Sequence, residues 1–286
     1  MNTVRLVTAK NLLLDLLRTS TSNAWPVKKL IEIAGMFDIS ENAVRVNLSR
    51  LVSRGLIETD SRGFYLMTRR YDPLRNWIDD WTRGEQRVTD WNDHWLCVTP
   101  PPAIKKKDWL ALDKSLLRFG FRPIETRMWV RPDNLSRSID SVNELINAVS
   151  GISDLIFTKI VELTINSQKL ELETLWDRAA LEEQYSRYTQ RLTTSMQRLE
   201  NADHSTALAE SFILGGEVIH LLALDPLLPA SMINTELRID LTQAMLAYDA
   251  HFHQIWRITL YSETVDRVPG DSEPHAPMAI DTYTSN

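Results

Sequence analysis

Side chains that can contact nucleic-acid bases gather in one short stretch of the sequence. They are the amide of Asn42, the guanidinium groups of Arg45 and Arg50, the hydroxyl of Ser49 and the small apolar side chain of Val46. In a DNA major groove an asparagine pairs with adenine and an arginine pairs with guanine. We therefore interpret Asn42 and Arg45 as base contacts, and Ser49, Arg50 and the more distant Arg62 as contacts to phosphates or neighbouring base edges. Ser40 and Val46 are further candidates for DNA contact.

The same stretch carries the signals of a helix that could present these side chains. Ser40 is a favourable N-cap, and Gly55 stands where a left-handed residue ends a helix. The apolar residues repeat with helical spacing, so they predict one buried stripe: Val44, Leu48, Leu51, Val52. The polar residues then fall on the opposite, exposed side, where a solvated surface is the alternative to a DNA-reading face.

The elements around this helix predict a winged helix-turn-helix over residues 1–70. The apolar spacing from Ala9 to Leu17 predicts a first helix, and a second begins at Pro26 and ends near Asp38. Two short strands, Leu56 to Thr59 and Phe64 to Thr68, follow as a hairpin around Gly63. Lys28 and Lys29 lie near the start of the second helix, where we interpret them as phosphate contacts or as ordinary surface lysines.

The rest of the chain alternates elements and then becomes helical, so we predict an α+β protein. After a connector over residues 71–90, the order β-α-β-β-α-β over residues 91–166 predicts a ferredoxin-like module. Residues 167–260 predict a C-terminal helical domain, and the proline- and polar-rich residues 261–286 predict a disordered tail.

Charge is distributed unevenly along the 286 residues. The net charge is −6, whereas residues 1–70 contain 11 basic and 6 acidic residues. This gives a basic N-terminal part joined to an acidic remainder, which would direct the N-terminal part toward a polyanion.

Several classes of function find no support in the sequence. No run of 18 apolar residues predicts a membrane span, and a single cysteine, Cys97, agrees with a reducing compartment, so we expect a cytoplasmic protein without membrane contact. His251 and His253 would point to different sides of a helix, and no third metal ligand follows at a recognisable spacing. Phosphate-cradling loops and nucleophile-elbow motifs are missing, so we expect neither enzymatic activity, nor a metal, nor a cofactor.

Short motifs occur in a fixed order between about residues 8 and 256. They are Glu41–Val52 with the hairpin after Gly55, then Trp95–Pro100, Phe119–Phe121 and Met128–Pro132, and finally Leu175–Trp176 and Asp225–Pro229. In this order the chain resembles the PaaX-type family, the repressors of bacterial phenylacetic-acid degradation genes and their relatives.

The resemblance implies a bacterial transcription regulator, a repressor, that binds double-stranded DNA as a homodimer. A small-molecule effector would release it from its operator, and by resemblance this would be an aryl-CoA thioester such as phenylacetyl-CoA. The chain departs from the family where Ala230–Asn234 replaces a Trp-Pro-Gly-like segment. The effector-binding residues therefore stay unassigned.

Two alternatives to an effector-responsive regulator remain at this point. The central module of the family resembles small ferredoxin-like nucleases that use an aspartate at the end of the first strand, so a metal-dependent nuclease is one alternative. This chain has Val98, Thr99 and Pro100 at that place, which does not support nuclease chemistry. A scaffold that keeps the fold but has lost its ligand is the other.

Overall fold

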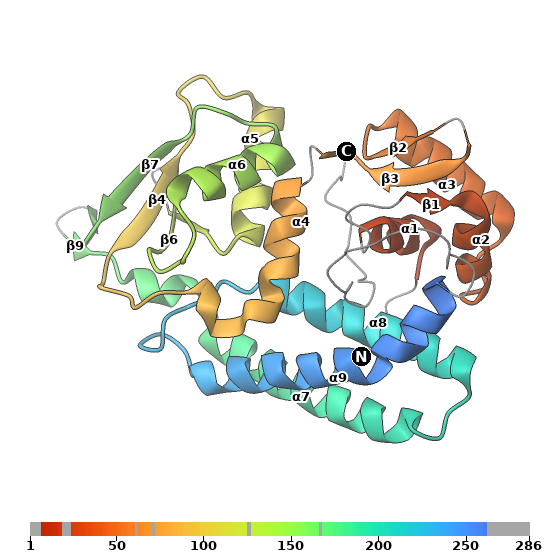
Figure 1. Ribbon diagram of the computed structural model, residues 1–286. Coiled ribbons are helices and arrows are strands. Elements are labelled where there is room, and N and C mark those ends of the chain that lie inside the picture. The colour runs from red at the N-terminus through yellow and green to blue at the C-terminus, as the bar shows by residue number, and fades with distance from the viewer. Residues whose placement is uncertain are drawn as a thin grey trace. The chain divides into compact units, whose positions relative to one another are not determined.

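The computed structural model of the protein describes residues 7–18, 24–60, 62–69, 72–124, 127–165 and 168–261 (Figure 1). Contacts divide the chain into two compact units. Unit 1 comprises Met1–Asp72, Thr189–His220 and Gln243–Asn286, and unit 2 comprises Pro73–Tyr188 and Leu221–Thr242. The disordered tail expected over residues 261–286 lies, from residue 262 onward, outside the described residues.

Unit 1 begins with three helices and a small antiparallel sheet. Its elements in order are α1 (Ala9–Arg18), β1 (Trp25–Pro26), α2 (Val27–Gly35), α3 (Glu41–Ser53), β2 (Ile57–Thr59) and β3 (Phe64–Met67). The sheet order is β1-β3-β2, and both pairings are antiparallel. The three helices and the hairpin agree with the elements predicted from the sequence.

The predicted start of α2 at Pro26 is wrong by one residue. Pro26 is extended, with φ −69° and ψ 138°, and it pairs with Phe64 in the sheet. The sequence pattern misses the strand β1 because two residues are too short to alternate visibly. The helix accordingly begins at Val27 and ends at Gly35, before the turn that leads to Asp38.

The apolar stripes of the three helices form the core of this part of unit 1. Ten side chains from these helices and from the segment that follows α3 are at most 5% exposed: Leu12, Leu13, Leu16, Leu30, Ile33, Val44, Leu48, Leu51, Leu56 and Ile57. The ring of Phe37 lies 5.1 Å from that of Phe212, so residues after position 189 contribute to the same unit. The buried stripe predicted for α3 is thus observed, with Val52 half-buried at its edge.

Unit 2 contains a four-stranded antiparallel sheet with two helices against one face (Figure 1). After α4 (Asp72–Asp79) and the 3-10 helix η2 (Asp80–Arg87), its elements are β4 (Trp95–Thr99), α5 (Lys106–Arg118), β5 (Arg122–Ile124), β6 (Met128–Pro132), α6 (Ile139–Ser150) and β7 (Ile156–Ile160). The strand order is β5-β6-β4-β7. Trp129 on β6 donates to Asp113 on α5 at 2.9 Å, which fixes the helix on this face.

The order β-α-β-β-α-β in unit 2 is the one that the sequence predicts. Three short elements after β7 were not predicted: β8 (Thr164–Ile165), β9 (Gln168–Lys169) and the 3-10 helix η3 (Leu172–Leu175). Each has two to four residues, which is too few for a periodic pattern.

Three long helices complete the described chain, and each contributes residues to both units. They are α7 (Arg178–Leu199), α8 (His204–Ala223) and α9 (Thr235–Tyr261). Among the described residues, one window, Thr206–Ala223 in α8, is long and apolar enough to cross a membrane, and 61% of it is buried. A core helix of a soluble protein meets the same criterion, so this window is weak support for a membrane span.

Candidate nucleic-acid interface

Helix α3 is fixed at both ends by its own residues. At the N-terminus the Ser40 hydroxyl accepts a hydrogen bond from the Ala43 amide at 3.3 Å. At the C-terminus Gly55 adopts φ +66°, and its carbonyl accepts a hydrogen bond from the Thr68 hydroxyl at 3.0 Å. The side chain of Ser40 is therefore used in capping the helix.

The outward side of α3 carries the side chains that the sequence singles out. Its exposed residues are Glu41, Asn42, Arg45, Val46, Ser49, Arg50 and Ser53. Within the described part of the chain, the side chains of Asn42 and Arg50 make no hydrogen bond or ion pair. Asn47, by contrast, donates to the Ala43 carbonyl at 2.8 Å and is turned toward the backbone. We call the exposed residues from Asn42 to Arg50 the α3 face.

Arg45 is held in one orientation by Glu41, one turn before it. Both Nε, at 2.8 Å, and Nη2, at 2.7 Å, contact Oε1 of Glu41. The pair is solvent-exposed, with 56% of the Arg45 side chain and 58% of the Glu41 side chain accessible. The sequence prediction did not include this contact, although a spacing of four residues on a helix indicates it.

Arg62 lies in the turn between β2 and β3, and its side chain is exposed. One carboxylate oxygen of Asp60 accepts hydrogen bonds from the amides of Arg62 and Phe64, each at 2.9 Å. This Asp60 contact organises the turn and leaves the Arg62 guanidinium available to solvent.

The two lysines of α2 occupy different environments. Lys28 is exposed, whereas Lys29 is 6% exposed and its ammonium contacts both carboxylate oxygens of Glu32 at 3.0 and 3.1 Å. The Lys29 ammonium is thus buried and already paired, whereas the Lys28 side chain is open to solvent.

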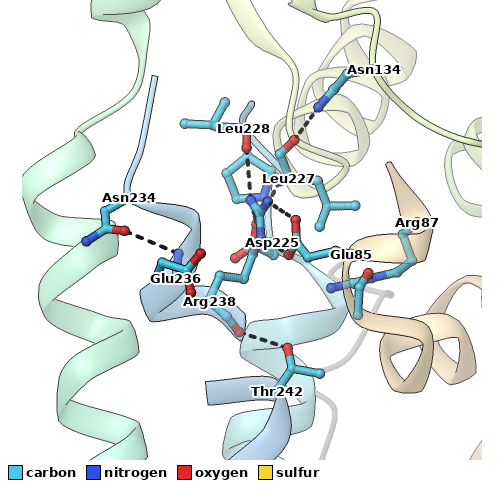
Figure 2. A network of polar contacts seen from close by, with 12 residues as sticks. Glu85, Arg87, Asn134, Asp225, Leu227, Leu228, Asn234, Glu236, Arg238 and Thr242 are labelled. Carbon is cyan, nitrogen blue, oxygen red and sulfur yellow. Dashed lines mark hydrogen bonds and ion pairs between the residues drawn. The ribbon is translucent and has the colours of Figure 1, made fainter. Parts of the chain in front are cut away.

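A second polar cluster lies in the interior of unit 2, around the irregular segment Asp225–Pro229. Five buried side chains bind backbone carbonyls of this segment or of the end of α8: Trp77 to Ala223 at 2.7 Å, Arg87 to Leu222 at 2.8 Å, Arg131 to Pro226 at 3.0 Å, Asn134 to Leu227 at 2.8 Å and Arg238 to Leu228 at 3.0 Å. Figure 2 shows part of this network, including the bonds from Asn134 to Leu227 and from Arg238 to Leu228. We call it the unit 2 network.

Asp225 supplies negative charge inside the unit 2 network. Its carboxylate accepts hydrogen bonds from the Tyr185 hydroxyl at 2.5 Å and the Leu227 amide at 2.7 Å, and Arg238 lies 3.6 Å away. Arg238 also makes a bidentate contact with Glu85, at 2.8 Å for both bonds (Figure 2). Leu227 adopts φ +53°, which is unfavourable for a branched side chain, so the bonds to its amide and carbonyl stabilise a strained turn.

Burial and neighbouring charges shift the pKa values of side chains in this cluster. Burial lowers the pKa of Arg131 to about 10, although Asp225 acts in the opposite direction. For Arg238, burial also favours a lower pKa, but the bonds to Glu85 and the charge of Asp225 outweigh it and raise the pKa. Burial and the Asp225 charge raise the pKa of Tyr185 well above its ordinary value, so its phenol keeps its proton.

The described residues offer no group of three or more His, Cys, Asp or Glu side chains that could hold a metal ion. His251 is exposed, and the side chain of His253 lies outside the described residues. Cys97 is buried in β4, and burial raises the pKa of its thiol to about 11, as suits a structural residue.

Comparisons with known proteins match both ends of the chain to one family. The model for PaaX-like proteins matches residues 9–71, and the model for the PaaX-like protein C-terminal domain matches residues 176–257. A search of curated proteins gave no match. Among solved structures, the uncharacterized protein Rv0674 from Mycobacterium tuberculosis is similar, with a TM-score of 0.50 and 20% identity over 87% of this chain and 98% of that one. At this identity the likeness extends to the fold alone.

The first family match spans α1 to β3, which includes the α3 face, and the second contains the Asp225–Pro229 segment of the unit 2 network. Together the two matches cover half of the sequence. The chain therefore belongs to the PaaX-like protein family.

Proposed function

We propose that this protein is a DNA-binding transcriptional regulator of the PaaX-like type and acts as a repressor. The α3 face carries the proposal, because it places amide, guanidinium, hydroxyl and methyl groups on one exposed side of a helix that is capped at both ends. These groups match the donors, acceptors and thymine methyl of a major groove. The helices α1 to α3 and the hairpin β2–β3 fit a winged helix-turn-helix, with α3 as the recognition helix.

The position of charge supports the same function. Residues 1–70 carry a net charge of +5, within a chain whose net charge is −6. Lys28 and Arg62 are exposed in this basic part and would contact phosphates, which fix the position of a protein on DNA without reading sequence. Asn42, Arg45, Val46, Ser49 and Arg50 would supply the sequence-dependent contacts.

The remainder of the chain would hold the dimer and effector surfaces. The strand order and antiparallel pairing of the unit 2 sheet fit a ferredoxin-like module. A homodimer with two reading helices would recognise two half-sites, and the symmetry of the operator would follow that of the dimer. The effector class, an aryl-CoA thioester, rests on the family resemblance.

A nuclease is not proposed. Strand β4 ends at Thr99, and no carboxylate stands where the ferredoxin-like nucleases have one. A regulator of this kind would act in the cytoplasm as a non-enzymatic protein.

The test is selection of bound sequences from randomised DNA duplexes, followed by mobility-shift titrations at several salt concentrations. We expect an enriched sequence with two related half-sites, and specific affinity that falls steeply with salt. Phenylacetyl-CoA should weaken this complex, with free CoA and phenylacetate as controls. Failure to enrich any sequence would overturn the proposal, and cleavage of the duplex in Mg²⁺ or Mn²⁺ would favour the nuclease.

A further inference from the structure

The contact between Glu41 and Arg45 leaves one edge of the guanidinium available. A guanidinium has five N–H groups, one on Nε and two on each terminal nitrogen. Glu41 takes the Nε hydrogen and one from Nη2. The remaining Nη2 and Nη1 hydrogens form the end-on fork, and this fork can still donate to two acceptors at once, such as O6 and N7 of guanine.

Stability does not account for this pair. Both side chains are more than half accessible, and exposed ion pairs of this spacing contribute about 0.3–0.5 kcal/mol to a helix. A carboxylate in the first turn also favours the helix dipole, but a side chain elsewhere in that turn would do the same. The position of Glu41 beside the α3 face needs a further reason.

The charge of Glu41 is unfavourable for binding a polyanion in general. On a face that approaches DNA, a carboxylate repels phosphates and the acceptor atoms of bases. This repulsion acts on every sequence, whereas the gain from an oriented Arg45 is realised when a guanine lies at the right position. The combination lowers non-specific binding more than specific binding.

We infer that Glu41 is a positioning residue that determines the sequence specificity of DNA binding: it orients Arg45 for a bidentate guanine contact and penalises complexes without that guanine. The inference rests on the proposed DNA-binding function; it adds Glu41 to the residues that determine specificity and assigns guanine as the base that Arg45 contacts. Two variants separate the two effects. Glu41→Gln keeps an oxygen that can accept from Arg45 but loses the charge, and Glu41→Ala loses both.

The experiment uses the full-length protein and the duplex enriched by the wild type. Affinities are measured for that duplex, for a scrambled duplex, and for the enriched duplex with 7-deazaguanine in place of each guanine in turn, which removes the N7 acceptor. At one guanine we expect 7-deaza substitution to weaken the wild type about tenfold, Arg45→Ala to be insensitive, and Glu41→Ala to lose most of the sensitivity.

Binding to the scrambled duplex tests whether the negative charge of Glu41 weakens non-specific DNA binding. Glu41→Gln should bind it several-fold more tightly than the wild type, with a salt slope steeper by up to about 1, so the ratio of specific to non-specific affinity falls. Glu144→Gln, an exposed carboxylate on α6, is the matched control for net charge and should leave the ratio unchanged. Circular dichroism of each variant verifies that α3 remains folded.

The outcomes distinguish the inference from the function on which it rests. If the wild type enriches a sequence but both Glu41 variants keep its affinity ratio and its 7-deaza sensitivity, Glu41 serves the helix terminus and the inference is wrong. If the wild type enriches no sequence, the proposed function itself fails.

Discussion

Arginines have opposite environments in the α3 face and in the unit 2 network. Arg45 is 56% accessible and is bound by a single carboxylate, whereas Arg131 and Arg238 are at most 1% exposed. Arg131 donates to the carbonyls of Phe119 and Pro226, at 2.7 and 3.0 Å. The buried guanidinium groups thus hold an irregular segment of backbone, and the exposed one keeps N–H donors open to solvent.

This comparison predicts that the two regions fail in different ways. Removing a charge from the unit 2 network leaves others buried without compensation, so the cost appears in the free energy of unfolding. Removing a side chain from the α3 face leaves the fold intact, so the cost appears in the affinity for DNA. Variants in the two regions can test each half of this contrast.

The largest effect is expected for Asp225→Ala. This change removes the acceptor for Tyr185 and for the Leu227 amide and leaves Arg238 with less compensating charge. The free energy of unfolding should fall by about 3–5 kcal/mol, as measured by urea denaturation. Asp90→Ala, at an exposed position, should change it by less than about 0.5 kcal/mol. An equal effect of the two changes would contradict the assigned role of the network.

Alanine substitutions at two glycines with positive φ test the backbone of the two regions. At Gly120, φ is +82° and an added Cβ would lie 2.9 Å from Pro226 Cα, whereas at Gly55, φ is +66° and the space is open. Gly120→Ala should destabilise by about 2–4 kcal/mol, from backbone strain and steric overlap. Gly55→Ala should cost about 1–2 kcal/mol, from strain alone. Thermal and urea denaturation check both values, and a reversed order would be inconsistent with this packing.

Tyr185→Phe tests one hydrogen bond of the network. Loss of its 2.5 Å bond to Asp225 should lower the free energy of unfolding by about 1.5–3 kcal/mol at pH 7. Because burial raises the pKa of Tyr185 in the folded state, this contribution is present below pH 10, the ordinary phenol value, and is lost as pH rises further. Wild type and variant should therefore converge in alkaline solution.

The control for this prediction is Tyr65→Phe, whose hydroxyl makes no hydrogen bond within the described residues. It should change the free energy of unfolding by less than about 0.5 kcal/mol at either pH. A constant difference between wild type and Tyr185→Phe from pH 7 to pH 11 would exclude the assigned protonation linkage.

Arg45→Ala tests the exposed half of the comparison. Specific DNA affinity should fall by about 1–3 kcal/mol, measured by mobility shift, while stability changes by less than about 0.5 kcal/mol. Arg178→Ala is the matched control, because Arg178 also pairs with a glutamate four residues away, at 2.8 Å, on an exposed helix surface. Unchanged affinity for Arg45→Ala would remove this residue from the reading face.

The smallest effect is expected for the lysines of α2. Lys28→Ala should reduce the slope of log affinity against log salt by about 1, because one phosphate contact is lost. Lys29→Ala should leave that slope unchanged, since its ammonium is buried against Glu32. A slope that falls equally in both variants would show that Lys29 leaves this pair when DNA binds.

Much of the fold follows from local patterns in the sequence. The stripe of Val44, Leu48 and Leu51 predicts the buried side of α3, and Ser40 and Gly55 predict its ends. The order of elements in unit 2 was predictable because β4, β6, β7 and the two helices have five or more residues, enough for a period to appear. Strands β1, β8 and β9 have two residues each and could not be found in this way.

The candidate site was predictable in part. Asn42, Arg45, Val46, Ser49 and Arg50 are exposed as expected, since helical spacing fixes which side a residue faces. Their contact with DNA, the dimer and the effector stay predictions. The burial of Lys29 depends on the packing around α2, which the types of neighbouring residues along the chain do not reveal.

The sequence by itself determined helix α3, its caps and its exposed side, because these depend on contacts between residues close together in the chain. The tertiary structure decided that Arg87, Arg131 and Arg238 are buried rather than exposed, because their partners lie far along the chain: 135 residues for Arg87 and Leu222, 95 for Arg131 and Pro226, and 153 for Arg238 and Glu85. From the sequence alone, every arginine is expected to be exposed. Only the folded chain supplies the carbonyls and carboxylates that allow an arginine to be buried.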